Sequence, residues 1–149
     1  MLIKRGFTLI ELIIVIALIG ILTTLVATNL QGARTRARDS RRKQDLVTIQ
    51  QALHLYYNDS QSFPLAITTI TPTYLTVLPQ DPSTAPTSPV NYGYNSSGAN
   101  YLLLTKLEDT SDSDIATSQA RCPSTYSSYV PPTGYPAKDS QKDYVVCEE

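Results

Sequence analysis

The stretch "KRGFTLIELIIVIALIG", residues 4–20, decides the architecture of the N-terminal third of the chain. Two cations open it, and the apolar run that follows is interrupted by a single carboxylate, Glu11. An ionised side chain in a hydrocarbon interior costs about 2.5 to 3.5 kcal/mol on insertion scales, so such residues tend to have a partner and a function. The sequence therefore predicts a cationic partner for Glu11.

The apolar run extends to Thr28, and Glu11 is the only charged residue between Phe7 and that point. A helix of this length would reach about 33 Å, enough to cross the hydrocarbon core of a bilayer. A cleaved secretory signal is the competing interpretation. Only six residues precede the run and no A-x-A-like site follows it, so a membrane helix over residues 7–28 is favoured.

Residues 29–59 contain no proline and many good helix formers, so the helix is predicted to continue to about Asn58. The spacing between Ala37 and Leu46 is two and a half helical turns, which places two apolar stripes on opposite sides. We expect the second stripe to pack on the chain's own sheet and the first to serve other copies. The stripes are Leu30, Ala33 and Ala37, and then Leu46, Ile49, Leu53 and Tyr56.

A basic belt lies just beyond the apolar run. Three interpretations are open: an ordinary solvated helix surface, which is favoured, an anchor at anionic lipid headgroups, or a contact for DNA. The formal net charge of −1 gives no general reason to expect a nucleic-acid binder. The belt consists of Arg34, Arg36, Arg38, Arg41, Arg42 and Lys43, and Asp39 interrupts it.

Residues 60–149 are rich in Pro, Ser, Thr, Tyr and Asn, which predicts a loop-rich β head. The segment "VNYGYNSSGANYLLLTKLE", residues 90–108, predicts two strands joined by a Ser-Gly turn. A last strand is expected near Tyr144 to Cys147. Together these strands would form a small antiparallel sheet.

The two cysteines, Cys122 and Cys147, are expected to form a disulfide in an oxidising compartment, where it would contribute about 3 kcal/mol. Two reduced, buried thiols in a cytoplasmic protein are the alternative. One histidine and two distant cysteines do not make a zinc site. His54 lies between two leucines without a catalytic partner, and no Gly-rich phosphate loop is present, so no enzymatic activity is expected.

The stretch "KRGFTLIELIIVIALIGIL", residues 4–22, resembles the class III signal and assembly helix of type IV pilins and related pseudopilins. The resemblance implies that a prepilin peptidase cuts after Gly6 and methylates the new N-terminal amine of Phe7. Glu11 matches the glutamate of the family, and its implied partner is the Phe7 amine of a neighbouring subunit. The positive-inside rule counted over the belt would place the head in the cytoplasm, whereas family members carry it on the outer side.

The head carries mixed signals about the branch of the family. "YLTVLPQDP", residues 74–82, resembles the loop that follows the helix in major pseudopilins, whereas a disulfide closing a C-terminal loop is more typical of type IV pilins. Many relatives have a helix-breaking proline where this chain has Thr28, which leaves local melting near Gly20 open. Major pseudopilins also bind calcium, and Asp109, Asp112 and Asp114 supply suitable oxygens, although a simple solvated loop is favoured.

The sequence thus predicts an α+β fold in which a long N-terminal α-helix, membrane-spanning in its first half and amphipathic in its second, packs on a small antiparallel β-sheet head with a C-terminal disulfide loop. Its parts would be a cleaved leader (1–6), a transmembrane and assembly helix (7–28), the amphipathic half of the helix (29–59) and a globular β head (60–149).

The resemblance implies a structural subunit of a type IV pilus, which polymerises through its N-terminal helix into an extracellular filament for adhesion, twitching motility or DNA uptake. A type II secretion pseudopilin and a monomeric membrane-anchored binding module are the alternatives. The implied partners are other copies, minor pilins, the prepilin peptidase, the membrane platform protein and the lipid bilayer, while nucleic acid has no support. The implied location is the inner membrane, single-pass with the head outside, and then a surface filament.

Overall fold

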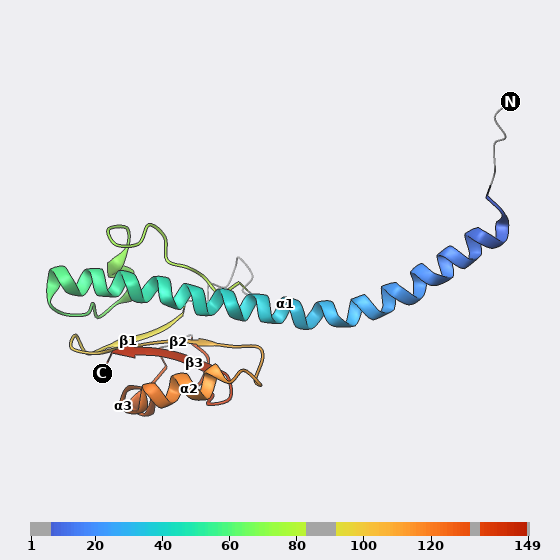
Figure 1. Cartoon of the computed structure of the whole chain (residues 1–149). Helices are drawn as coiled ribbons and strands as arrows, with labels where there is room; N and C mark the ends of the chain where they lie inside the picture. Colours follow the sequence, from blue (N-terminus) through green and yellow to red (C-terminus); the bar gives the residue numbers. More distant parts are fainter. Residues whose placement is uncertain (1–6, 83–91, 132–134, 149) are drawn as a thin grey trace. The chain divides into compact units, whose positions relative to one another are not determined.

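The computed structural model describes residues 7–82, 92–131 and 135–148, and Figure 1 shows the order of the elements along the chain. Contacts within the chain define two compact units, residues 1–35 and residues 36–149. The predicted leader, with the cleavage position after Gly6, lies outside the described residues.

One long helix, α1 (Leu9–Ser60), accounts for most of the first 60 residues, which confirms the prediction of a continuous N-terminal helix. The helix ends where Gln61 adopts a left-handed φ of 54° and donates its N–H to the carbonyl oxygen of Tyr57 at 2.7 Å. Pro64 follows shortly afterwards and prevents the helix from resuming.

Within the part of the chain that the structure describes, no helix is both long enough and apolar enough to cross a membrane. The side chains of residues 25–29 are not among those described. The membrane span over residues 7–28 therefore stays a prediction from the sequence.

The head contains a three-stranded antiparallel sheet in the order β1-β2-β3, formed by β1 (Gly93–Ser96), β2 (Tyr101–Lys106) and β3 (Asp143–Glu148). Gly93 of β1 lies opposite Leu104 of β2. The turn between β1 and β2 contains Gly98 at a φ of 86°, which favours glycine. The predicted strand pair, its Ser-Gly turn and the final strand are confirmed.

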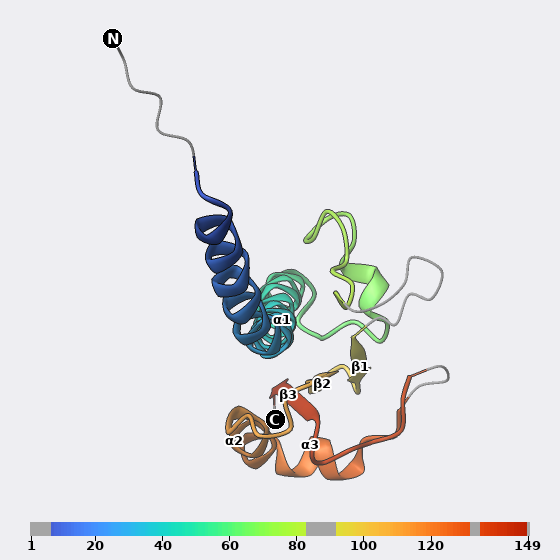
Figure 2. The same cartoon turned by 90° about the vertical axis from the view of Figure 1, so that its right-hand side faces the viewer.

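The sheet lies between two helical layers (Figures 1 and 2). The C-terminal part of α1 covers one face, and two short helices, α2 (Asp114–Arg121) and α3 (Pro123–Ser128), cover the other. Neither short helix was predicted, since only a sheet was expected in the head. The segment "PSTYSS" is poor in strong helix formers, and only Pro123 at the first helical position signals a helix start.

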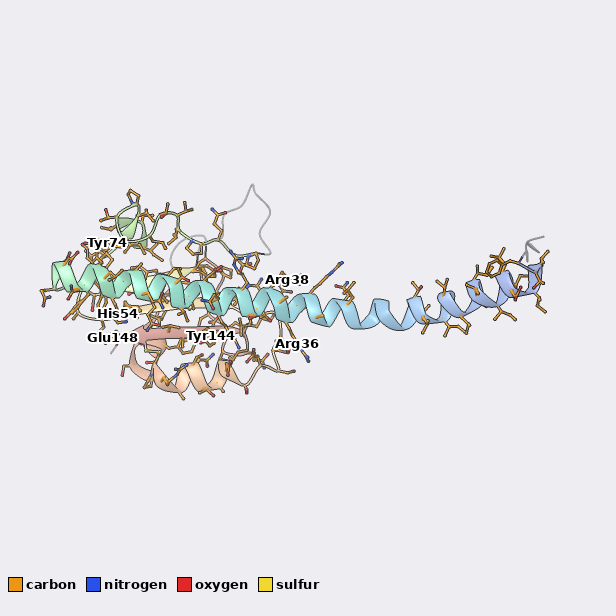
Figure 3. All side chains as sticks on the ribbon, turned by 45° about the horizontal axis from the view of Figure 1, so that its top comes forward. Arg36, Arg38, His54, Tyr74, Tyr144 and Glu148 are labelled. Atoms are coloured by element: carbon orange, nitrogen blue, oxygen red, sulfur yellow. A yellow bond between two sulfur atoms is a disulfide. The ribbon has the colours of Figure 1, made fainter. Side chains whose placement is uncertain are left out.

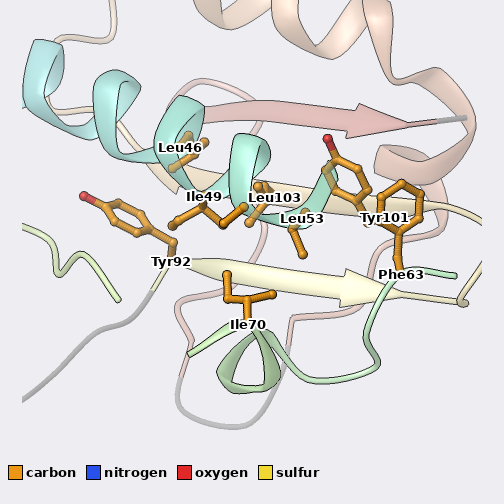
Figure 4. Close-up of a cluster of buried hydrophobic side chains, with 9 residues drawn as sticks. Leu46, Ile49, Leu53, Phe63, Ile70, Tyr92, Tyr101 and Leu103 are labelled. Carbon is orange, nitrogen blue, oxygen red and sulfur yellow. The ribbon is translucent and has the colours of Figure 1, made fainter. Parts of the chain in front are cut away.

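The two faces of the sheet are buried in two separate hydrophobic clusters. The first, drawn in Figure 4, lies between α1 and the sheet, and Ile70 of the short 3-10 helix η1 (Ile67–Ile70) joins it. Leu46, Ile49 and Leu53 are fully buried there, which confirms the prediction for the second stripe of α1. The second cluster consists of Leu102, Leu104, Cys122, Tyr126, Tyr129 and Val145.

The predicted disulfide between Cys122 and Cys147 is confirmed, with the two Cα atoms 5.9 Å apart. Cys122 immediately precedes α3, and Cys147 belongs to β3. The bond therefore attaches the start of α3 to the sheet.

Candidate functional site

The first candidate site is the apolar surface of α1 between residues 7 and 24. The exposed fraction of its large apolar side chains runs from 47% at Val15 to 90% at Phe7. A helix that is apolar around its circumference requires lipid or other helices as its surroundings. The exposed side chains are Phe7, Leu9, Ile10, Leu12, Ile13, Ile14, Val15, Ile16, Leu18, Ile19, Ile21 and Leu22.

Glu11 forms a local capping box with Thr8 at the start of this helix. The Glu11 carboxylate accepts hydrogen bonds from the Thr8 N–H at 2.9 Å and from the Thr8 hydroxyl at 2.7 Å. In return, the Glu11 N–H donates to the Thr8 hydroxyl oxygen at 3.4 Å. This reciprocal arrangement satisfies free backbone donors at a helix N-terminus. This capping box was not predicted, although the T-x-x-E pattern that signals it is visible in the sequence.

The second candidate site is a group of charges around the buried Arg42 side chain that we call the Arg42 cluster: Arg42, Asp39, Asp81 and Glu108. The Arg42 guanidinium donates from Nε and Nη2 to both oxygens of Asp81, at 2.8 and 2.9 Å. Nη2 also donates to Glu108 Oε1 at 2.9 Å, and Nη1 donates to Asp39. The Arg42 side chain is only 2% exposed, so its charge depends on these carboxylates.

Asp39 connects the Arg42 cluster to the loop that follows β2. Its carboxylate accepts the backbone N–H of Glu108 at 2.9 Å and 3.1 Å and that of Asp109 at 2.9 Å. Arg42 and Asp39 belong to α1, whereas Asp81 belongs to the segment between α1 and the sheet. The cluster therefore holds three separate parts of the head together.

The charges of the cluster shift the ionisation of its members. Hydrogen bonds from Arg38, and then from Arg42, lower the pKa of Glu108 to about 2. Burial alone would lower the pKa of Arg42, but its hydrogen bonds to Asp81 and Glu108 raise it above the usual value. Both groups therefore stay charged throughout the physiological pH range.

The three predicted calcium ligands lie beside the basic belt. Lys43 Nζ donates to Asp112 Oδ2 and to Asp114 Oδ2, each at 2.7 Å. Partial burial would raise the pKa of Asp112, but the hydrogen bond from Lys43 lowers it. Asp109 accepts a hydrogen bond from the Ser111 N–H at 3.0 Å. Its Oδ2 also lies 3.9 Å from Arg36 Nε.

A cavity of about 150 Å³ separates the acidic loop from α1, and Asp39, Asp109 and Asp112 line it together with Arg36, Ser40 and Lys43. Among the residues described, no group of three or more His, Cys, Asp or Glu side chains is arranged to hold a metal ion. Calcium binding by Asp109, Asp112 and Asp114 stays a prediction.

Most of the basic belt is engaged in ion pairs within the head, and Figure 3 shows Arg36 and Arg38 on this part of α1. Arg38 pairs with Glu108, and Arg41 pairs with Asp45 at 3.2 Å. The favoured interpretation of a solvated surface is therefore wrong for Arg42, which is buried. Its partners Asp81 and Glu108 lie 39 and 66 residues away in the sequence, so no local pattern could reveal them.

His54 lies on α1 opposite the end of β3, as Figure 3 shows. Its Nε2 is 3.9 Å from a carboxylate oxygen of Glu148, and its ring makes edge-on contacts with Phe63 and Tyr101. The side chain is 45% exposed. These contacts are those of a packed surface histidine.

The class of protein follows from the N-terminal segment. Residues 1–27 match the family model of the prokaryotic N-terminal methylation motif. That motif covers Gly6, Phe7 and Glu11, the residues on which the resemblance was based. The N-terminal segment is therefore similar to that of prepilins, the class that includes the type IV pilin-like proteins.

Relatives of this chain carry one shared name, that of a core protein of type II secretion systems. The chain is 39% identical over 61 residues to the type II secretion system core protein G of Escherichia coli, a match that covers 41% of this chain and 42% of the relative. It is 35% identical over 89 residues to the protein of the same name from Dickeya chrysanthemi, covering 60% of this chain and 54% of the relative. The chain thus spans about half or less of the length of these relatives. No solved structure matches it.

Proposed function

We propose that this chain is a structural subunit of a type IV pilin-like filament that assembles through residues 7–24. The observation that carries the proposal is the exposed apolar surface of this segment, which coincides with the N-terminal methylation motif. Burying one Leu, Ile or Phe side chain stabilises an assembly by about 1.5 to 3 kcal/mol. Burial of the twelve exposed side chains would therefore strongly favour association. A structural subunit of this kind performs no catalysis.

Before assembly, the same surface requires a lipid environment. We propose that residues 7–28 anchor the chain in the inner membrane, with the head on the outer side. The prepilin motif supports this location, and so does the absence of any charged residue other than Glu11 in the segment. A prepilin peptidase would cut after Gly6, and a membrane platform protein would move the mature subunit into the filament.

In the filament, Glu11 would pair with the N-terminal amine of Phe7 of a neighbouring copy. An unpaired carboxylate among apolar helices has an unfavourable free energy, so this pairing would stabilise one register between subunits over the others. The carboxylate lies one helical turn from Phe7 in the same chain and is already held by Thr8. Minor pilins would join the filament through the same segment.

The relatives favour a filament of the type II secretion kind, because the proteins named above are core protein G of that system. A surface pilus for adhesion, motility or DNA uptake is the second candidate, and the disulfide between Cys122 and Cys147 favours it. Calcium binding at Asp109, Asp112 and Asp114 would support the secretion filament.

The test is to determine the N-terminal residue and the mass of the protein in two fractions of the producing cell: filaments sheared from the surface and the membrane. A chain that begins at methylated Phe7 is the expected result in at least one fraction. Processed protein in sheared filaments would identify a surface pilus, and processed protein confined to the membrane would identify a secretion filament. An intact chain from Met1 in both fractions would contradict the proposal and favour a membrane-anchored binding module.

A further inference from the structure

A cavity of about 290 Å³ lies at the end of the sheet where β1 turns into β2. It is separate from the Arg42 cluster, which lies beyond the opposite end of β2. The six residues of β2 place roughly 20 Å between the two sites. The cavity is lined by Asn95, Ser97, Asn100, Tyr101, Leu102, Ser124, Thr125, Ser128 and Tyr129.

The chemistry of the lining selects a neutral, hydroxyl-rich ligand. None of the nine residues carries a charge, so an ionic ligand would find no countercharge. Two amides and four aliphatic hydroxyls face one small volume, and each can both donate and accept hydrogen bonds. The hydroxyl groups of a sugar have the same double capacity. Two tyrosines and a leucine add the apolar surface against which the C–H groups of a sugar ring can pack.

The size of the cavity limits the ligand to one ring. Sites for drug-sized molecules occupy about 300 to 1,000 Å³, and this cavity lies at the lower end of that range. Tyr129 is only 7% exposed, and its hydroxyl has no hydrogen-bond partner among the residues described. A Cβ atom at Gly93 would lie 2.9 Å from that hydroxyl, so the glycine leaves the tyrosine room in the wall.

The walls of the cavity are held in place without a ligand. Three lining residues belong to α3, which starts directly after Cys122 and is fixed to β3 by the disulfide. On the other side, the Asn100 N–H donates to the Ser97 hydroxyl at 3.3 Å. The Phe63 N–H donates to the Gly98 carbonyl at 2.7 Å, which ties the turn to the residues after α1. A preformed site loses less conformational entropy when a ligand binds.

We propose that this cavity binds a single neutral sugar unit of a glycan. The cavity lies between the turn of the β1–β2 pair and α3, within residues 36–149, whereas the assembly segment is residues 7–24. Its accessibility in a filament rests on the proposed function, but binding by a single chain does not. The sugar would hydrogen-bond to Asn95 and Asn100 at the turn and to the hydroxyl groups of α3.

The experiment uses the full chain in dodecylphosphocholine micelles, because this detergent contains no sugar. The methyl glycosides of glucose, galactose, mannose and N-acetylglucosamine are added one at a time, and saturation-transfer difference NMR detects binding. We expect at least one of them to bind, with a dissociation constant near the millimolar range. Asn95→Ala, which removes an exposed amide of the lining, is expected to weaken binding at least fivefold.

Asn58→Ala is the matched control, since it removes an exposed asparagine amide outside the cavity. It should leave the dissociation constant within twofold of the original. Reduction of the disulfide should weaken binding, because α3 then loses its attachment to β3. The proposal is overturned if none of the four glycosides binds, or if Asn58→Ala and Asn95→Ala weaken binding equally. The N-terminal processing at Gly6 is measured independently of this result.

Discussion

Two regions of the helix α1, residues 7–24 and residues 36–53, differ in the kinds of side chain that they expose and bury. In the first region, large apolar side chains are exposed, and even the least exposed of them, Val15, has an exposed fraction of 47%. In the second region, the charged side chain of Arg42 is only 2% exposed, beside fully buried Leu46 and Ile49. Hydropathy alone would predict that the apolar side chains of residues 7–24 are buried and that Arg42 is exposed.

The difference shows that burial depends on the partners that the chain provides. Arg42 is buried because Asp39, Asp81 and Glu108 meet it with several charge-assisted hydrogen bonds. Among the residues that the structure describes, the large apolar side chains of residues 7–24 stay exposed instead. A region whose side chains find their partners within one chain therefore contributes to the stability of that chain. A region whose side chains stay exposed without such partners indicates assembly with other molecules. The following predictions test that distinction.

The largest effect on assembly is expected for Glu11→Gln. A glutamine keeps the capping box with Thr8 but removes the charge, so the variant should form the same helix start and lose the pairing with a neighbouring amine. We expect the yield of sedimentable filaments to fall by at least about tenfold, equivalent to about 1.4 kcal/mol per subunit. Quantitative immunoblotting of sheared and membrane fractions measures this yield.

Thr8→Val is the control for that experiment, because it removes the hydroxyl of the capping box and leaves the carboxylate. Filament yield should then stay within about twofold of the native value, a change of less than about 0.5 kcal/mol. An equal loss in both variants would mean that the helix cap, rather than the charge of Glu11, governs assembly.

Arg42→Met should cause the largest loss of head stability. It leaves three carboxylates without their shared cation, and breaking a buried pair costs about 3 to 5 kcal/mol. Urea unfolding monitored by the near-ultraviolet signal of the tyrosines would measure the change. Arg41→Met is the control, since that side chain is 70% exposed and should cost no more than about 1 kcal/mol. Similar losses in the two variants would refute the role given to the Arg42 cluster.

Removing the disulfide should have a somewhat smaller effect on the head. The bond closes a loop with a sequence separation of 25, for which the chain-entropy model gives about 3 kcal/mol. The double variant Cys122→Ala and Cys147→Ala should therefore unfold at lower urea concentration, while the helicity of residues 7–24 stays unchanged. Loss of helicity in that region would show that the two regions are coupled.

Lys43→Met should destabilise the head by up to about 1 kcal/mol, because Lys43 bridges two partly exposed carboxylates. The variant should also respond more strongly to calcium than the native chain, since Asp112 and Asp114 lose their internal cation. Melting temperatures with and without about 5 mM calcium chloride, which exceeds the dissociation constants of about 0.1 to 1 mM of extracellular calcium sites, measure the difference. An equal response of both proteins would place any calcium site away from Lys43.

The smallest effect is a change in the shape of the acid-unfolding curve. The folded-state pKa of Glu108 is about 2, below its ordinary value of 4.5, so its contribution to stability is complete above pH 4.5 and disappears as the pH falls towards 2. Glu108→Gln should therefore flatten the loss of stability between these two pH values. Glu148→Gln, at the exposed end of β3, serves as the control. Identical curves for Glu108→Gln and the native head would refute this assignment.

Local patterns in the sequence were sufficient to predict the elements of the fold that depend on periodic spacing or on residues close in the sequence. The spacing of Leu46, Ile49 and Leu53 predicted the buried face of α1, and the alternating segment around Gly98 predicted the hairpin. The cysteines predicted their own disulfide, because no other thiol competes for either of them.

The parts that were missed depend on distant pairs or on weak propensity. The carboxylates of Asp81 and Glu108 meet Arg42 only in the folded head. Nothing in the sequence near Lys43 indicates that it bridges Asp112 and Asp114, 69 and 71 residues away. The helices α2 and α3 are short and are stabilised by tertiary packing, which outweighs the weak propensity of their own sequences. Tyr126 of α3 packs with Leu102 and Leu104, and the Ser118 hydroxyl of α2 accepts the Val145 N–H of β3 at 3.2 Å.

The capping box at the start of α1 has a consequence for the reversibility of assembly. Because the Glu11 carboxylate already accepts two hydrogen bonds from Thr8, an incoming amine exchanges one set of partners for another. The free energy of that exchange is the difference between two states in which the carboxylate has hydrogen-bond partners. It is smaller than the free energy gained when a carboxylate without any partner acquires one. If Glu11 pairs with a neighbouring amine as proposed, a subunit that leaves the filament would return to its own cap. The same carboxylate would then keep the departing chain intact for another round of assembly.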